Sequence, residues 1–143
     1  MVEVHIMATY LSLGLSILAL ILTFRFYRLT YIGRRYSSLD RLYLSLYQQA
    51  MDHPYVLDPE FTTNYKEQEK DKRLVYESYA FQAWMIVESV IDLYSDSGFK
   101  DKHYKTWKVV IKTEAELHLT WLLDESQKNK FKEDFLTHIK DIV

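Results

Sequence analysis

An uninterrupted apolar run near the N-terminus limits what this chain can fold into more than any other feature. From Ile6 to Phe24 the sequence carries no formally charged side chain. A helix of this length, rising about 1.5 Å per residue, spans roughly 28 Å, which is close to the hydrocarbon thickness of a bilayer. The run therefore predicts a transmembrane helix over residues 6–24.

A cleaved signal peptide is the alternative interpretation of the same run. Signal peptides begin with basic residues and end in small residues before the cleavage point. Residues 1–5 contain Glu3 and His5 but no Lys or Arg, and the run ends in bulky and basic side chains. We therefore expect an uncleaved anchor, with residues 1–5 forming a short extracytoplasmic N-terminus.

The segment that follows the anchor, residues 25–37, predicts its orientation. No acidic residue occurs there before Asp40, and arginines alternate with aromatic side chains. Cytoplasmic flanks are enriched in Lys and Arg, and tyrosines gather at headgroup depth. We expect a single pass through the cell membrane, with the N-terminus outside and residues 38–143 forming a cytoplasmic domain. The expected membrane-interface residues are Arg25, Tyr27, Arg28, Tyr31, Arg34 and Arg35.

The expected partners follow from this anchor and from the overall charge. Solvation beside anionic lipid accounts for an arginine cluster this short better than a phosphoinositide or nucleic-acid site does. The net charge of −2 likewise gives no preference for nucleic acid. Ala8, Ser12 and Ser16 form a ladder of small residues that favours helix pairing in lipid. We expect the bilayer, together with a protein partner or a homo-oligomer in the membrane, as partners.

The rest of the chain predicts an all-α domain. Only three glycines and two prolines occur, which is too few turn residues for a β-rich fold. Apolar residues recur at helical spacing, and short connections favour a small antiparallel bundle of three to four helices. We expect helices over residues 38–51, 66–95, 102–123 and 125–142, with a loop over 54–65. Whether the first of these continues from the anchor is open, because Gly33 is the sole weak point between them.

Two polar residues in the 102–123 helix form the main candidate site. Glu114 and His118 lie four residues apart, one turn along the same face, within an apolar stripe flanked by tryptophans. An unpaired carboxylate in such a place is costly, so both side chains need partners. They form either a hydrogen-bonded pair that fixes helix register or part of a ligand site.

A metal site would require more donors than this pair provides. Glu88 and Asp92 share a secondary stripe of the preceding helix. Together with Glu114 and His118 they would supply three carboxylates and an imidazole for a divalent cation. Di-iron helical bundles, however, use Glu-x-x-His from two helices. This chain has one Glu-x-x-x-His and no second histidine at matching spacing, so metal binding is the alternative hypothesis and no cofactor is predicted.

No catalytic signature occurs in the sequence. It has no cysteine, which excludes disulfides and thiolate chemistry, and it has no nucleophile elbow, P-loop, dinucleotide fingerprint or H-E-x-x-H motif. We therefore expect a non-enzymatic interaction protein, such as an accessory subunit or adaptor of a larger membrane complex. Trp84, at the edge of an apolar helix face, is the expected partner contact. A sensor whose anchor helix transmits a change to the domain is a third hypothesis.

The layout resembles a set of uncharacterised bacterial single-pass membrane proteins, in which an anchor precedes a small helical cytoplasmic domain. The resemblance rests on the anchor followed by arginines, on the segment from Glu88 to Tyr94, and on the segment from Trp107 to Trp121. It covers most of the chain and implies no activity.

Overall fold

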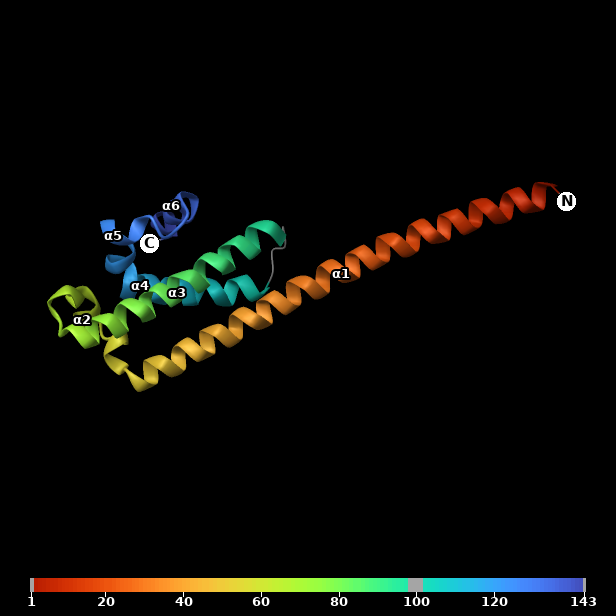
Figure 1. The fold of residues 1–143 in the computed structure, drawn as a ribbon. Helices are drawn as coiled ribbons and strands as arrows, with labels where there is room; N and C mark the ends of the chain where they lie inside the picture. The colour runs from red at the N-terminus through yellow and green to blue at the C-terminus, as the bar shows by residue number, and fades with distance from the viewer. Residues whose placement is uncertain (1, 98–101, 143) are drawn as a thin grey trace. The chain divides into compact units, whose positions relative to one another are not determined.

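The computed structural model describes residues 2–97 and 102–142, with side chains over 10–95 and 104–142. Within these ranges the chain is helical and contains no strand, which confirms the all-α prediction (Figure 1). Six α-helices and two 3₁₀ helices follow one another in the described residues. They are α1 (Val2–Asp52), η1 (Pro54–Leu57), α2 (Pro59–Thr63), η2 (Tyr65–Glu67), α3 (Lys70–Ser97), α4 (Lys102–Leu122), α5 (Glu125–Lys128) and α6 (Glu133–Ile142).

The chain divides into two compact units, residues 1–35 and residues 36–143. Helix α1 supplies all of the described part of the first unit and the first element of the second. The first helix of the domain is continuous with the anchor helix, because α1 runs without a break through Gly33 and through the expected helix start at Ser38.

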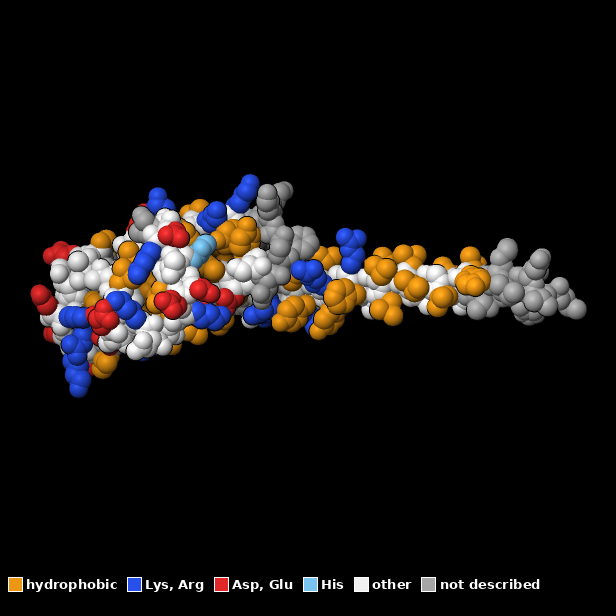
Figure 2. Space-filling model, turned by 90° about the horizontal axis from the view of Figure 1, so that it is seen from above, with side chains coloured by type: hydrophobic (Ala, Val, Ile, Leu, Met, Phe, Trp, Pro, Cys, Tyr) orange, Lys and Arg blue, Asp and Glu red, His pale blue; other side chains and the backbone are white. Residues whose placement is uncertain are grey.

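The described part of the first unit is a single helix with a long apolar segment. Large aliphatic side chains are exposed over most of the circumference of this segment, and in Figure 2 hydrophobic side chains recur along the face that is shown. They include Leu11, Leu13, Leu15, Ile17, Leu18, Leu20, Ile21 and Leu22. The most apolar window has a mean hydropathy of 1.6, and α1 is the one helix of the described chain that is long and apolar enough to cross a membrane. A soluble protein buries such a helix, and here no residue of that window is buried.

The second unit is organised around α3 and α4, which lie side by side and run antiparallel (Figure 1). Tyr76 near the start of α3 packs against His118 near the end of α4, with ring centroids 5.6 Å apart. Tyr94 near the end of α3 stacks on Tyr104 near the start of α4, at 3.7 Å. Residue numbers therefore increase along α3 while those of the contacting residues decrease along α4, as expected of antiparallel helices. The broad apolar face expected of α3 is buried along its length, including Ala80, Val87 and Val90.

Three predicted boundaries are wrong. The expected loop over residues 54–65 is largely helical, because it holds η1 and α2. Helix α3 begins at Lys70 and not at residue 66, because residues 65–67 form η2, whose C-cap Gln68 is extended. The expected helix over residues 125–142 is two helices, because α5 ends at Lys128 and α6 begins at Glu133. The Glu88 carboxylate accepts a hydrogen bond from the Lys132 N–H (3.0 Å), which gives α6 a start of its own.

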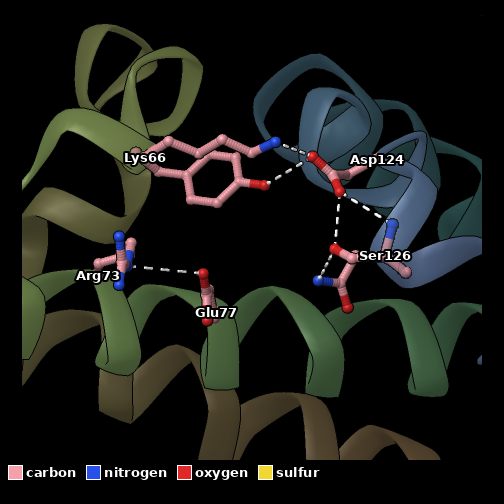
Figure 3. A network of polar contacts seen from close by, with 7 residues as sticks. Lys66, Arg73, Glu77, Asp124 and Ser126 are labelled. Atoms are coloured by element: carbon pink, nitrogen blue, oxygen red, sulfur yellow. Dashed lines mark hydrogen bonds and ion pairs between the residues drawn. The ribbon is translucent and has the colours of Figure 1, made fainter.

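A polar network centred on Asp124 joins η2 to the start of α5 (Figure 3). Asp124 is the N-cap of α5 and accepts hydrogen bonds from the Ser126 N–H (3.0 Å) and hydroxyl (2.6 Å). The other carboxylate oxygen pairs with Lys66 and accepts a hydrogen bond from the Tyr65 hydroxyl (3.5 Å). A short helix of one turn is unstable alone, so these contacts hold it against η2.

We predict that Asp124→Ala lowers the free energy of unfolding by about 1–2 kcal/mol through loss of the cap. The hydrogen bond from Lys66, followed by those from Ser126, holds the pKa of Asp124 well below its usual range. The contribution is therefore present above about pH 4 and is lost as the pH falls further. Denaturant titration of the full chain in detergent, followed by tryptophan fluorescence, measures it.

Glu125→Ala is the matched control for this prediction. Its side chain is 87% exposed and pairs with Lys128 on its own helix, so removing it changes stability by less than about 0.5 kcal/mol. Equal effects of the two substitutions would contradict the role given to Asp124.

Candidate functional site

The candidate site is a buried polar cluster in the second unit, built around Glu114 and His118 of α4. Both side chains are sealed from solvent, at 2% and 0% exposure. Glu114 Oε2 and His118 Nε2 lie 3.5 Å apart. The four-residue spacing places them one turn apart on the face that α4 turns into the core.

Two tyrosines from other helices complete the cluster. The Tyr43 hydroxyl of α1 donates a hydrogen bond to Glu114 Oε1 (3.0 Å). The Tyr76 hydroxyl of α3 lies 3.3 Å from His118 Nδ1. The Tyr79 ring meets the His118 ring edge-on at 5.4 Å. The cluster thus links α4 to both α1 and α3 at one level of the domain.

Burial sets the protonation of the pair. It raises the pKa of Glu114, an effect that the Tyr43 hydrogen bond partly opposes. It also lowers the pKa of His118. Both shifts have one cause, because a medium of low dielectric constant disfavours each charged form. Between about pH 4 and pH 7 the pair therefore carries one proton, which lies on the Glu114 carboxyl while the His118 imidazole is neutral.

Glu114 Oε2 and His118 Nε2 lie 3.5 Å apart but form no hydrogen bond in the described residues. With Glu114 protonated and His118 neutral, either imidazole tautomer fits the Tyr76 hydroxyl. Nδ1–H donates to this hydroxyl in one tautomer, and Nδ1 accepts from it when the ring hydrogen is on Nε2. In both cases the net charge of the pair is zero, so burial costs far less than it would for a lone carboxylate. The geometry supports an internal structural role for the cluster.

The other two predicted metal ligands have partners of their own. The carboxylate of Glu88 accepts the Lys132 N–H, and Asp92 forms an ion pair with the Lys132 ammonium. In the part of the chain that the structure describes, no group of three or more His, Cys, Asp or Glu side chains is placed to hold a metal ion. A joint site of Glu88, Asp92, Glu114 and His118 therefore stays a prediction of the sequence alone.

The expectation that Trp84 lies exposed as a partner contact is wrong. Its side chain is 0% exposed. Its indole N–H donates to the His118 carbonyl oxygen (3.3 Å), and its ring meets Phe135 at 6.1 Å. Both α4 and α6 pack on α3, so the buried face of α3 extends to Trp84. Trp84 is thus a core residue that helps to fix α4.

The six predicted membrane-interface residues lie exposed along α1. The rings of Tyr27 and Tyr31 stack at 6.3 Å. The Arg35 guanidinium lies 5.7 Å from the centre of the Tyr31 ring, a separation within cation–π range. Arg25, Arg28 and Arg34 are also exposed along α1. The segment therefore presents cationic and amphipathic side chains together.

Sequence reasoning missed three members of these sites. They are Tyr43, Tyr76 and Lys132, the last of which falls inside the helix expected over residues 125–142. The partners of Tyr43 and Tyr76 are 71 and 42 residues away in the chain, so no local spacing points to them. The one available signal was the need of a buried Glu–His pair for donors, which tyrosines supply.

Comparison with known proteins adds no assignment. No protein-family model matches the sequence, and neither the curated proteins nor the solved structures gave a match.

Opposite pH dependences are predicted for the two single variants of the pair. Glu114→Gln leaves His118, whose pKa is lowered on folding, so stability falls as the pH decreases below about 6.5. His118→Gln leaves Glu114, whose pKa is raised on folding, so stability falls as the pH increases above about 4.3. Each slope is at most about 1.4 kcal/mol per pH unit.

The unsubstituted chain is the control for this pair. Near pH 5.5 it holds one proton on Glu114 and His118 both when folded and when unfolded, so its slope should be shallower than either variant's. Denaturant titrations across pH, read from the three tryptophans, give the slopes. Slopes of the same sign in the two variants would contradict the shared proton.

The Tyr43 hydrogen bond gives a separate prediction. Tyr43→Phe leaves Glu114 Oε1 without the hydrogen-bond donor described above, and we expect the free energy of unfolding to fall by about 1–3 kcal/mol. Tyr27→Phe is the matched control on the same helix, because Tyr27 is 66% exposed and lies outside the second unit. Its effect should stay within about 0.5 kcal/mol. A loss no larger than the control's would remove Tyr43 from the cluster.

Proposed function

We propose that this chain is a membrane-anchored, non-enzymatic interaction protein, such as an accessory subunit or adaptor of a larger membrane complex. The observation that carries the proposal is the exposed apolar surface of α1 between Leu11 and Leu22, which covers most of the helix circumference. In water, each exposed leucine of this kind forgoes about 1.5–3 kcal/mol of burial. A bilayer removes that penalty for the whole segment at once.

The orientation follows from the residues beside the anchor. Arg25, Arg28, Arg34 and Arg35 flank its C-terminal end, whereas residues 1–5 hold no Lys or Arg. The N-terminus is then outside and residues 38–143 face the cytoplasm. Tyr27 and Tyr31, half exposed or more, sit at headgroup depth in this arrangement.

The interaction role is supported by the character of the domain. Its polar cluster is sealed, so Glu114 and His118 serve the fold and are out of reach of a substrate. Its surface retains exposed apolar side chains, among them Leu44, Met51 and Val109, at 67%, 71% and 67%. Such side chains near a membrane suit contact with another protein.

Membrane extraction and labelling test the anchor. After an alkaline wash, the full chain should stay in the membrane pellet. Because the chain has no cysteine, single-cysteine variants Val2→Cys and Ser45→Cys report orientation. An impermeant maleimide added to intact cells should label the first and spare the second until the membrane is opened. Release by the wash, or equal labelling of both, would contradict the proposal.

Gentle solubilisation of native membranes tests the interaction role. We expect the chain to elute from size exclusion with a mass greater than one copy plus its detergent, either with another protein or as an oligomer. A strictly monomeric chain to which nothing stays attached would argue against an adaptor or accessory subunit.

A further inference from the structure

We propose that α1 pairs in parallel with α1 of a second copy of this chain, along one face that runs from the anchor into the domain. This inference rests on the proposed function, because it needs two chains that enter the bilayer in the same direction.

The part of this face that lies in the second unit is exposed and apolar. Leu44, Tyr47 and Met51 recur at spacings of three and four residues and are 67%, 53% and 71% exposed. Leu46 and Ala50, which α1 turns into the domain core, are 2% and 1% exposed. The apolar face is therefore distinct from the face that the domain already uses, so a second helix can pack on it without displacing the core.

The same spacing continues toward the N-terminus of α1. We call the whole row the α1 seam. Its steps alternate between four and three residues, an average of about 3.5, which is the period of two helices wound around each other with a left-handed twist. The seam consists of Ser12, Ser16, Ala19, Thr23, Phe26, Thr30, Gly33, Ser37, Asp40, Leu44, Tyr47 and Met51.

The chemistry of the seam changes where the surroundings change. Between Ser12 and Ser37 it holds small residues at every position except Phe26, and Gly14 is the sole Gly, Ala, Ser or Thr off the seam in that stretch. Small residues allow helices to approach closely in lipid, where apolar bulk gives no advantage. Beyond the arginines the seam turns apolar at Leu44, where water makes burial favourable.

A second copy is the occupant that fits these features. Two copies in one membrane have the same orientation. A two-fold axis along the pair therefore places each seam residue opposite the same residue of the other copy. Small residues then meet small ones in lipid, and apolar residues meet apolar ones outside it. A different partner would need an equally long helix with the same change of character at the same depth.

Charge along α1 agrees with this pairing. All five arginines between residues 25 and 41 lie off the seam, and Asp40 is its one charged member. Arg41 follows Asp40 at the flanking position, and its Nε donates to the carbonyl of Ser37, a seam residue (3.2 Å). Its guanidinium is thereby held beside the seam, where in a parallel pair it reaches Asp40 of the other copy and offsets repulsion between the two carboxylates.

Gly33 points to the same face. In the described part of the chain nothing lies within 4 Å of a Cβ added at Gly33 or at Gly14. Neither glycine is needed for packing within one copy, although each weakens the helix relative to alanine. Gly33 lies on the seam, where a second backbone would approach, and Gly14 lies off it. The two glycines therefore form a matched pair for a test.

The test is oxidative cross-linking of single-cysteine variants of the full chain in washed native membranes. The absence of native cysteine makes each cross-link specific. Leu44→Cys and Met51→Cys on the seam should form dimers, whereas Leu42→Cys, also exposed at 53% but on another face, should not. Adding Gly33→Leu to the Leu44→Cys chain should lower the dimer–monomer ratio about fivefold, and adding Gly14→Leu should leave it unchanged.

Each outcome separates this inference from the proposed function. Seam-specific cross-links that Gly33→Leu weakens support the pairing. Chain present in the membrane pellet with no cross-link, or with equal cross-linking at residues 42 and 44, overturns the pairing and leaves an anchored protein that binds a different partner. Chain absent from the membrane pellet overturns the pairing and the proposed function together.

Discussion

The exposed apolar surface of α1 is unfavourable in water, and this constraint underlies the proposed function. Between Leu11 and Leu22 exposed leucines and isoleucines occupy most of the helix circumference, and small residues such as Ser12, Ser16 and Ala19 occupy the remaining face. Under the proposed function, hydrocarbon surrounds this surface, and the helix satisfies its own backbone hydrogen bonds there. Under the proposed function, the arginine and tyrosine side chains that follow mark where α1 leaves the lipid.

The second unit has a different constraint, because its core contains a carboxyl group and an imidazole that are costly to bury in their charged forms. The two groups form a pair that holds one proton, and the hydroxyl groups of Tyr43 and Tyr76 contact its two ends. Those hydrogen bonds run from α4 to α1 and to α3. A shift of any of these helices by one turn would leave a buried polar atom without its partner, so the cluster favours a single register.

Local pattern was sufficient for features that depend on neighbours in the sequence. The uncharged run, the helical spacing of α4 and the shared face of Glu114 and His118 were all evident from residue order. Contacts between segments far apart in the sequence were not evident from residue order. Tyr43 and Glu114 meet only after α1 and α4 pack, and Trp84 is buried because two helices cover one side of α3.

The break between α5 and α6 illustrates the same limit. Residues 125–142 carry a helical pattern, yet Lys132 is held by Glu88 and Asp92 from α3, and a new helix begins after it. No local signal reveals these carboxylates, which lie 44 and 40 residues before Lys132 in the chain. The same holds for Glu88 and Asp92, which the sequence predicted as metal ligands. Their partner Lys132 contacts them only in the folded domain, so the sequence could not reveal it.

Collision accessibility of spin labels on α1 in lipid vesicles tests the central claim most directly. A label at Leu18, inside the apolar segment, should collide more with oxygen, which partitions into hydrocarbon, than with a water-soluble nickel chelate. A label at Ser45, past the arginines, should show the reverse preference. Equal access of the chelate to both positions would contradict the assignment of α1 as a membrane anchor.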